Sequence, residues 1–541
     1  MAEWWRGSVT YQIYPRSFQD ANGDGDGDLA GITRRLPYLA DLGVDAIWLS
    51  PVFVSPMADM GYDVSDYTDI DPRFGSLADF DAMVARAHEL GLKVIIDQVL
   101  SHSSSEHPHF IESRGSRDNP KSDWYVWADP KHDGSPPNNW LSIFGGGAWQ
   151  WETRRRQYYL HNFLAEQPDF NFHNPDVQDW LLSTMRFWLD RGVDGFRLDT
   201  VNFYFHDKLL RDDPADFRVK DKPEWNPYGM QYHLFSKNQP ENLPFLERMR
   251  KLLDEYEARA MVGEMGESHH AIRMMGEYTT GKRLHKCYSF EMLGDGFSAA
   301  HFRRQIDEFF TGAPGGWPTW AFSNHDVVRH VTRWSKQGLS DEALAKLAGA
   351  LLLSLQGSIC VYQGEELGQT ETDLEFFELD DPQGKRFWPE NKGRDGCRTP
   401  MVWDNAEASS GFSTGRPWLP IKGPQAARHV AGQLGDPDSV LELYRRMLRL
   451  RRETEALRTG RTTFFDTSEP VLAFLRGAEV ICVFNLSPET HEVTLTGAGA
   501  LAISENAERT GDRLKLHPNG FALFEAVGEV SVADGPAAAV S

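Results

Sequence analysis

The sequence has little positive charge for its length. Its 541 residues include 56 lysines and arginines against 79 aspartates and glutamates, a formal net charge of −23 at pH 7. Nucleic acids and anionic membrane surfaces bind through clusters of lysine and arginine, so this balance argues against both as partners. An acidic surface favours instead a neutral or cationic small ligand.

A disulfide framework and a membrane or export segment are also missing. The four cysteines are widely separated, and Cys360 and Cys482 lie in apolar runs, which predicts buried free thiols. No run of about 18 apolar residues occurs, and the N-terminal stretch MAEWWRGSVTYQ has no basic region followed by an apolar one. We therefore expect a cytoplasmic protein without a membrane partner, either a monomer or a homodimer.

A pattern of helix, glycine and short apolar strand recurs through the first 460 residues. LPYLADLG leads into a strand at 44–51, FDAMVARAHELG into one at 92–98, and LLSTMRFWLDRG into one at 193–199. The helices have apolar residues at i, i+3 and i+4, and the strands are continuous apolar runs, as in a parallel sheet. Five further segments fit less closely: 9–15, 258–264, 286–292, 318–326 and 357–366. Eight strands alternating with helices predict an α/β fold, the (β/α)8 TIM barrel.

Two long segments interrupt the predicted barrel, and a different pattern follows it. The segments after strands 3 and 8 are too long for ordinary connections between a strand and a helix. Beyond residue 460, short alternating strands predict an antiparallel β domain. The predicted organisation is a barrel over 1–102 and 170–460, an inserted B subdomain over 103–169, a long strand-8 loop over 366–415, a C-terminal β domain over 461–532 and a frayed tail over 533–541.

Polar and charged side chains gather at the ends of the predicted strands and early in the loop after strand 2: Tyr62, Asp63, Asp97, His102, Arg197, Asp199, Glu264, His325 and Asp326. In a barrel these ends face a common site. Each carboxylate alone could merely cap a helix or pair with an arginine, but their convergence favours acid–base and nucleophilic chemistry, as in glycoside hydrolysis. Aromatic residues in the covering loops suit sugar rings, although each could have only a packing role: Trp140, Phe144, Trp149, Phe163 and Phe203.

The stretch DANGDGDGDLAGI at 20–32 carries oxygen-bearing side chains on alternate positions: Asp20, Asn22, Asp24, Asp26 and Asp28. The order is like the first part of an EF-hand loop, with Gly25 at the sixth position, but Gly31 stands where that loop requires glutamate. The residues themselves leave two interpretations open, a solvated acidic turn and a cation site.

Several motifs together resemble glycoside hydrolase family 13, the α-amylase family. Four of them are similar to its signature regions, in order: DQVLSH (97–102), GFRLDTVNF (195–203), VGEMG (262–266) and FSNHD (322–326). Four more also match: GYDVSDY (61–67), QPDFN (167–171), YQGEELG (362–368) and GRDGCRTPMVW (393–403). The resemblance covers nearly the whole chain and is to the bacterial α-glucosidase and oligo-1,6-glucosidase group.

The resemblance implies roles for the matched residues. Asp199 would be the nucleophile, Glu264 the general acid and base, and Asp326 the carboxylate that stabilises the transition state. Arg197 would keep Asp199 ionised. Tyr62 would stack on the glucose and Asp63 would bind its outer hydroxyls. The implied substrate-binding residues are Tyr62, Asp63, His102, Phe144, Phe163, Arg197, Thr200, His325 and Arg394.

The resemblance implies no catalytic cofactor but a structural divalent cation, Ca²⁺ or Mg²⁺, at the 20–28 loop. Its ligands would be the side chains of Asp20, Asn22, Asp24 and Asp28 and the main chain of Asp26. The cation would stabilise the start of the barrel and take no part in breaking the glycosidic bond.

The implied activity is that of a retaining α-glucosidase acting on a small-molecule α-glucoside. Thr200 follows the nucleophile, where the family tends to have threonine or alanine with α-1,4 action and valine with α-1,6 action. The two long loops predict a pocket that admits one terminal glucose, and its dryness favours transglucosylation as a side activity. Other members of the family act on sucrose or trehalose as transferases or isomerases, or as oligo-1,6-glucosidases, and these remain alternatives. A non-catalytic transporter-associated homologue is least favoured, because all three carboxylates are present.

Overall fold

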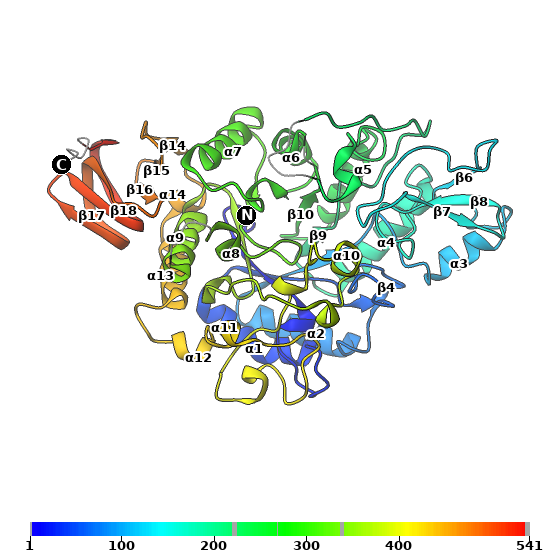
Figure 1. Ribbon diagram of the computed structural model, residues 1–541, viewed down its shortest axis with the longest axis horizontal. Coiled ribbons are helices and arrows are strands. Elements are labelled where there is room, and N and C mark those ends of the chain that lie inside the picture. Colours follow the sequence, from blue (N-terminus) through cyan, green and yellow to red (C-terminus); the bar gives the residue numbers. More distant parts are fainter. Residues whose placement is uncertain (1–2, 219–223, 268, 336–339, 536–541) are drawn as a thin grey trace.

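The computed structural model describes residues 3–218, 224–267, 269–335 and 340–535, with a barrel at its centre (Figure 1). Eight parallel strands form one sheet in the order β11-β10-β9-β5-β2-β1-β13-β12. Their bounds are β1 (Val9–Ile13), β2 (Ala46–Leu49), β5 (Lys93–Gln98), β9 (Gly195–Leu198), β10 (Ala260–Met265), β11 (Lys286–Ser289), β12 (Thr319–Trp320) and β13 (Ser358–Tyr362). A bridge between Cys287 and Pro318 joins the two edge strands, so the sheet is a nearly closed barrel and the predicted fold class is confirmed.

A helix follows each barrel strand along the chain. These helices are α1 (Leu29–Leu42), α2 (Leu77–Glu89), α4 (Pro175–Asp190), α5 (Asn242–Leu253), α6 (Ala271–Thr279), α7 (Ala299–Gly312), α9 (Asp341–Ser354) and α13 (Val440–Glu453). Gly43, Gly91 and Gly192, the residues predicted to end three of them, have φ of 103°, 79° and 97°. This left-handed conformation strains other residues, which explains why glycine stands at each helix end.

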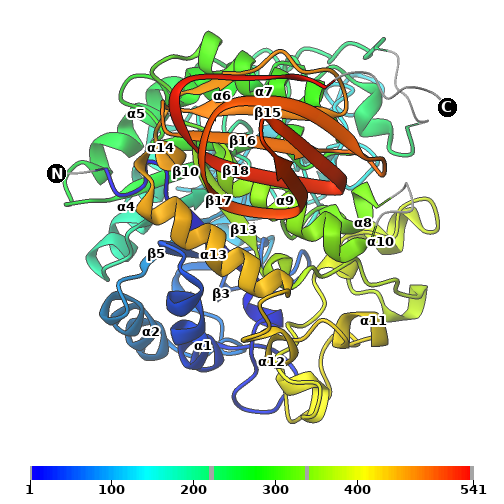
Figure 2. The ribbon, with the colours of Figure 1, turned by 90° about the vertical axis from the view of Figure 1, so that its left-hand side faces the viewer.

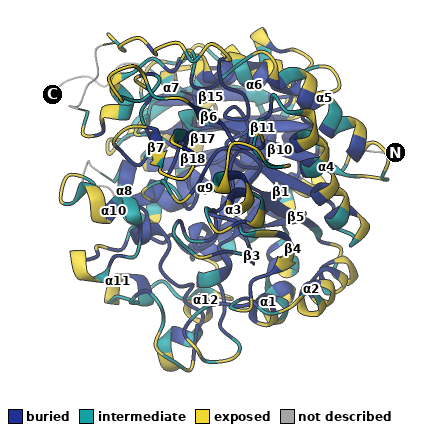
Figure 3. Ribbon diagram, turned by 90° about the vertical axis from the view of Figure 1, so that its right-hand side faces the viewer, coloured by how far each residue is buried: buried dark blue, intermediate teal, exposed yellow. Residues whose placement is uncertain are grey.

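The barrel strands are buried on both faces, as Figure 3 shows in dark blue. Every residue of β1, β2, β9, β10, β11 and β13 is buried. A strand covered by helices on one face and by the barrel interior on the other has no solvent-facing side, which is why its sequence is a continuous apolar run. All four cysteines are free and buried, as predicted.

Long segments leave the barrel after several strands. After β2, β3 (Phe53–Val54) pairs with β4 (Asp66–Ile70). The segment after β5 contains α3 (Pro108–Gly115), β6 (Trp127–Ala128), β7 (Trp149–Glu152) and β8 (Gln157–Leu160), with a sheet in the order β6-β8-β7. The segment after β13 contains α10 (Pro382–Phe387), α11 (Gly423–Ala426) and α12 (Val430–Gln433), and α8 (His330–Trp334) and α14 (Glu455–Arg458) are further short helices. A third long excursion, between β9 and α5, is absent from the sequence prediction.

An antiparallel sheet ends the chain, as predicted, at the opposite end of the molecule from β6–β8 (Figures 1 and 2). Its order is β14-β15-β16-β18-β17, with bounds β14 (Thr462–Phe464), β15 (Val471–Arg476), β16 (Val480–Asn485), β17 (His491–Thr510) and β18 (Arg513–Asp534). The last two strands are longer than the predicted short ones. Ala533 and Asp534 pair with β17, so the predicted frayed tail 533–541 begins inside the sheet. Residues 536–541 lie outside the described part.

The described helices include none with the length and apolar character needed to cross a membrane. The cytoplasmic location and the monomeric or dimeric state stay predictions.

Candidate active site

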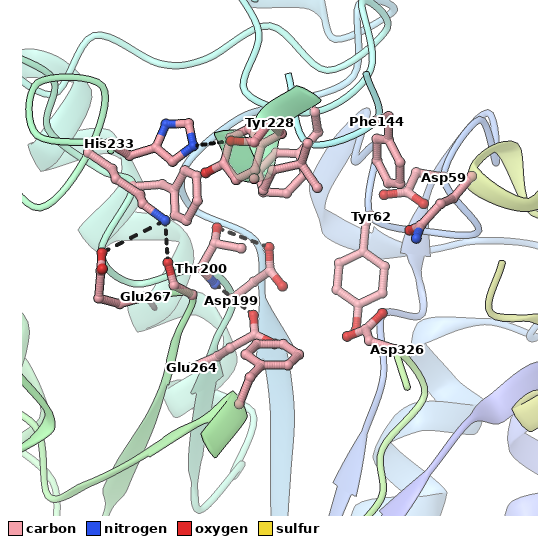
Figure 4. A pocket seen from close by; sticks show the side chains of 18 of the residues that line it. Asp59, Tyr62, Phe144, Asp199, Thr200, Tyr228, His233, Glu264, Glu267 and Asp326 are labelled. Atoms are coloured by element: carbon pink, nitrogen blue, oxygen red, sulfur yellow. Dashed lines mark hydrogen bonds and ion pairs between the residues drawn. The ribbon is translucent and has the colours of Figure 1, made fainter. Parts of the chain in front are cut away.

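The C-terminal ends of the barrel strands open into a cavity of about 490 Å³. Asp199 follows β9, Glu264 lies in β10, and His325 and Asp326 follow β12, so strands distant in sequence place these groups in one space. In Figure 4, Asp199 and Glu264 lie across the cavity from Tyr62 and Asp326. Eleven of the residues predicted from the sequence line it: Tyr62, His102, Phe144, Phe163, Asp199, Thr200, Phe203, Glu264, His325, Asp326 and Arg394.

The guanidinium of Arg197 lies beneath the cavity and joins its carboxylates. Nη1 lies 2.7 Å from Asp199 Oδ1 and 2.9 Å from Asp97 Oδ1, and Nη2 lies 2.6 Å from Glu264 Oε1. The side chain is fully buried, and Tyr288 accepts the remaining hydrogen bonds at 3.2 and 3.0 Å. Because one rigid guanidinium binds both Asp199 and Glu264, it fixes the two carboxyl groups relative to each other.

Thr200 supplies a second link between the same two carboxyl groups. Its N–H donates to Glu264 Oε2 at 3.0 Å, and its hydroxyl donates to Asp199 Oδ2 at 3.3 Å. The backbone of Thr200 has φ of 41°, which is unfavourable for a β-branched residue. Such strain is found where the surrounding structure holds a functional geometry, and here it directs the N–H at Glu264.

Burial changes the protonation of both carboxyl groups. It raises the pKa of Glu264 to about 8 and that of Asp199 to about 7, with Arg197 opposing both shifts. Arg197 acts in the expected direction and lowers the pKa of Asp199, but loss of solvation outweighs its charge. The higher value for Glu264 favours the state in which Glu264 is protonated and Asp199 is ionised.

Asp326 stays ionised in the same cavity. Burial acts to raise its pKa, but His325, whose neutral ring has Nε2 3.3 Å from Asp326 Oδ2, and the positive charges of two arginines outweigh this and hold the pKa below its usual range. Arg398 Nη2 lies 3.2 Å and Arg394 Nη1 3.4 Å from Asp326 Oδ1. Arg398 was not among the predicted site residues, although it lies in the quoted GRDGCRTPMVW motif.

The two predicted histidines are neutral. Burial lowers the pKa of His102 to about 4 and that of His325 far below its ordinary value. His325 Nδ1 lies 2.7 Å from the Gln12 amide, and Nε2 lies 2.6 Å from the Tyr62 hydroxyl. With the Gln12 amide as donor to Nδ1, His325 carries its proton on Nε2 and donates it to the Tyr62 oxygen. The Tyr62 hydroxyl in turn donates a hydrogen bond to Asp97 Oδ2 at 3.1 Å.

One wall of the cavity is built around an ion pair that the sequence did not reveal. Arg394 Nη2 lies 2.7 Å from Asp59 Oδ1, and the Arg394 guanidinium carbon lies 5.1 Å from the Phe144 ring centre. The amide of Gln167 donates to Asp59 Oδ2 at 3.2 Å. Arg394 was predicted as a site residue. Asp59, three residues before Tyr62, was not, because no sequence motif marked it.

The prediction that Asp63 binds sugar hydroxyls is wrong in this structure, and Asp59 takes that position. Asp63 is fully buried and does not line the cavity. Its carboxylate accepts hydrogen bonds from the Ser55 hydroxyl at 3.0 Å and from the N–H groups of Ala58 and Asp59 at 2.8 and 3.0 Å. Asp63 therefore shapes the turn that presents Asp59. Arg197 likewise lies behind the cavity and acts through the carboxylates.

Of the five aromatic residues proposed as covers, three line the cavity. Phe163 lies between Phe144 and Phe203, with ring centres 6.1 and 5.6 Å away. Trp140 and Trp149 stack on each other at 5.9 Å, and their indole N–H groups bond to the Arg211 carbonyl and Asn138. These two residues have the packing role.

The unpredicted excursion after β9 forms the opposite wall. Tyr228, His233 and Lys237 line the cavity from it, and the Tyr228 and His233 rings stack at 3.8 Å. Trp225 contacts Phe387 of α10 at 4.8 Å, and Asn226 donates to the Ile143 carbonyl at 2.7 Å. Three excursions thus meet above the cavity. The long gap between a strand ending near 199 and the next helical pattern was the available signal.

The residues of the 20–28 loop bond mainly to the loop itself. Asp20 accepts from the N–H groups of Asn22, Gly23 and Gly25 at 2.9, 2.7 and 2.8 Å, and Asp28 caps α1. Asp26 pairs with Arg16 and Arg73. Within the described residues, no three His, Cys, Asp or Glu side chains form a group able to hold a metal ion. These groups do not include the Asn22 side chain or the Asp26 main chain, so the divalent ion stays a prediction to be tested by metal removal.

The chain is similar to carbohydrate-active proteins over nearly its whole length. Residues 12–460 match the family model described as "Alpha amylase, catalytic domain". A Rhizobium meliloti protein named "Probable alpha-glucosidase" is 57% identical over 496 residues, 90% of each chain. An oligo-1,6-glucosidase of Heyndrickxia coagulans is 36% identical over 565 residues, 97% of this chain and 99% of the relative.

Solved structures show the same similarity. An α-glucosyl transfer enzyme superposes with a TM-score of 0.93 and 54% identity, covering 97% of this chain and all of the other. A trehalulose synthase from Pseudomonas mesoacidophila has a TM-score of 0.87 and 33% identity over the same shares.

Proposed function

The chain belongs to the α-amylase family, glycoside hydrolase family 13, and we propose that it is a retaining, exo-acting α-glucosidase. Its substrates would be short α-1,4-linked glucosides such as maltose, from whose non-reducing end it releases α-glucose. The observation that carries the proposal is the pairing of Asp199 and Glu264 on one buried guanidinium, in a cavity with the Asp59–Arg394 ion pair in its wall.

In the first step of this mechanism, Asp199 attacks the anomeric carbon while Glu264 donates its proton to the glycosidic oxygen. The bond to the leaving sugar breaks, and a β-linked glucosyl ester forms on Asp199. The ionised Glu264 then takes a proton from water, which attacks the same carbon and releases Asp199. Two inversions restore the α configuration. The higher pKa of Glu264 supports its assignment as the acid.

Three further groups suit the positive charge that develops on the sugar. Asp326 is ionised, so its carboxylate stabilises an oxocarbenium-like transition state. His102 and His325 are neutral and can hydrogen-bond hydroxyl groups without adding a positive charge that would oppose it.

Exo action is supported by the wall that contains Asp59 and Arg394. Both side chains are nearly buried, at 4% and 9% exposure, and they are paired with each other. A further sugar attached to the non-reducing end of the bound glucose would have to break this desolvated ion pair, which is costly. The three excursions that meet above the cavity support a preference for short substrates in the same way.

The proposal includes the glycosidic linkage that is cleaved and the transfer of glucose to a sugar acceptor. Thr200 lines the cavity beside both Asp199 and Glu264, in position to contact the leaving sugar. We assign it to α-1,4 preference, with oligo-1,6-glucosidase action as the alternative. Transglucosylation is supported by similarity to the α-glucosyl transfer enzyme, and action on sucrose by similarity to the trehalulose synthase.

Product analysis tests these assignments. The purified protein is incubated separately with maltose, isomaltose, sucrose and trehalose, and the anomer of the first glucose released is followed by NMR. We expect maltose to be the best substrate and α-glucose to appear first. A malto-oligosaccharide blocked at its non-reducing end should resist cleavage. Initial β-glucose would contradict retention, and turnover of sucrose alone would contradict the α-1,4 assignment.

A further inference from the structure

Arg394 reaches the active-site wall from the excursion after β13, outside the barrel strands. It is a long side chain with many rotamers, and three carboxylates surround it. Asp59 and Asp326 belong to the cavity, at 2.7 and 3.4 Å. The third, Asp381, does not line the cavity and is fully buried. Some feature must hold the guanidinium in place when no sugar is bound, and the contacts identify Asp381.

The Asp381 carboxylate accepts hydrogen bonds from both the main chain and the guanidinium of Arg394. Asp381 Oδ2 accepts from the Arg394 backbone N–H at 2.7 Å, and Oδ1 accepts from Nη2 at 2.7 Å. Nε lies 3.2 Å from both oxygens. Contact with the guanidinium and with the main chain of the same residue fixes the direction in which the side chain leaves the chain.

The backbone around Asp381 leaves room for these hydrogen bonds to Arg394. Asp381 caps α10 by accepting from the Gln383 N–H, and its own N–H donates to Asp395 at 2.8 Å. Gly393 has φ of 75°, and a Cβ there would lie 2.4 Å from Asp381 Oδ2 and 2.6 Å from Gly384. Only glycine leaves room for the carboxylate beside Arg394.

We propose that Asp381 is a positioning residue that holds Arg394 against Asp59 and so sets how firmly the wall binds the terminal glucose. This inference rests on the proposed α-glucosidase function and deepens it. We expect Arg394 to bind the terminal glucose about equally before and during the reaction, so its loosening should raise KM more than it lowers kcat. Asp326 would still be paired with Arg398, whose Nη2 lies 3.2 Å from Asp326 Oδ1.

The first test is Asp381→Asn, which keeps the shape and one of the two acceptor oxygens but removes the charge and replaces the other oxygen with a donor. With maltose we expect KM to rise about tenfold and kcat to stay within about threefold. The matched control is Asp395→Asn. Asp395 is equally buried and follows Arg394 in the chain, but its carboxylate accepts from the backbone N–H groups of Asp380 and Asp381 rather than from the Arg394 side chain. This control should lower the melting temperature and leave KM within about twofold.

A double-mutant cycle with Arg394→Lys separates positioning from a general structural role. If Asp381 acts through Arg394, the double variant binds maltose no more weakly than Arg394→Lys alone. Additive losses would overturn the inference, as would an equal rise in KM for Asp395→Asn. An unchanged KM in Asp381→Asn, with a wild-type protein that hydrolyses maltose, would overturn it as well. A wild-type protein inactive on all four disaccharides would instead refute the proposed function.

Discussion

The protonation states of Asp199 and Glu264 predict a narrow pH profile for kcat/KM. Activity requires Asp199 ionised and Glu264 protonated, and burial raises their pKa values to about 7 and about 8. With these values, the active form makes up about 60% of the protein near pH 7.5 and about 3% two pH units to either side. We therefore expect kcat/KM for maltose to fall about 20-fold between about pH 7.5 and either about 5.5 or 9.5.

The variant Glu264→Gln tests whether deprotonation of Glu264 causes the fall of kcat/KM at high pH, the basic limb of the profile. A substrate with a leaving group that needs no proton, such as α-glucosyl fluoride, bypasses the acid, so this variant should form the glucosyl ester with no basic limb. The matched control is Glu365→Gln, because burial also raises the pKa of Glu365 to about 8 although it does not line the cavity. Measured with maltose, whose leaving group does need a proton, this control and the wild type should both retain the basic limb. A basic limb that persists in Glu264→Gln, or disappears in Glu365→Gln, would refute the assignment.

The same shifts affect stability. The folded-state pKa of Glu264 lies above its value of about 4.3 in an unfolded chain, so folding favours the protonated form. Its contribution to the free energy of unfolding is complete below that lower value and is lost as the pH rises through about 8. Glu264→Gln should therefore raise the melting temperature relative to wild type more at pH 8 to 9 than at pH 4 to 5, as thermal unfolding would show.

Three other predictions follow from single features. Asp59→Asn should raise KM for maltose about tenfold, whereas Asp63→Asn should mainly lower the melting temperature; the reverse result would restore Asp63 as the sugar ligand. Thr200→Val should increase the ratio of isomaltose to maltose turnover, and an unchanged ratio would mean that this side chain does not set linkage. Removal of a bound divalent ion with EDTA should lower the melting temperature by several degrees without changing the order of substrate preference. If mass spectrometry finds no metal and EDTA has no effect, the 20–28 loop is a solvated acidic turn.

The barrel could be predicted because its pattern is local. Three of the helices are followed by a glycine in the left-handed conformation, and the strands are mostly apolar because both their faces are covered. The catalytic carboxyl groups could be predicted for a related reason. They follow strand ends, and a parallel barrel brings those ends to one face. The excursion after β9 was missed because an irregular segment has no periodicity to mark it.

The sequence by itself determined the alternation of strands and helices, the buried cysteines and the positions of Asp199, Glu264 and Asp326. These follow from propensity, spacing and chain order. Only the tertiary structure decided that Asp59, and not Asp63, faces the cavity, since only three residues of turn separate two chemically identical side chains. It also decided that burial outweighs Arg197 in raising the pKa of Asp199, and that Asp381 holds Arg394. Desolvation and contacts between distant segments depend on the packing of the whole chain, and no local pattern records them.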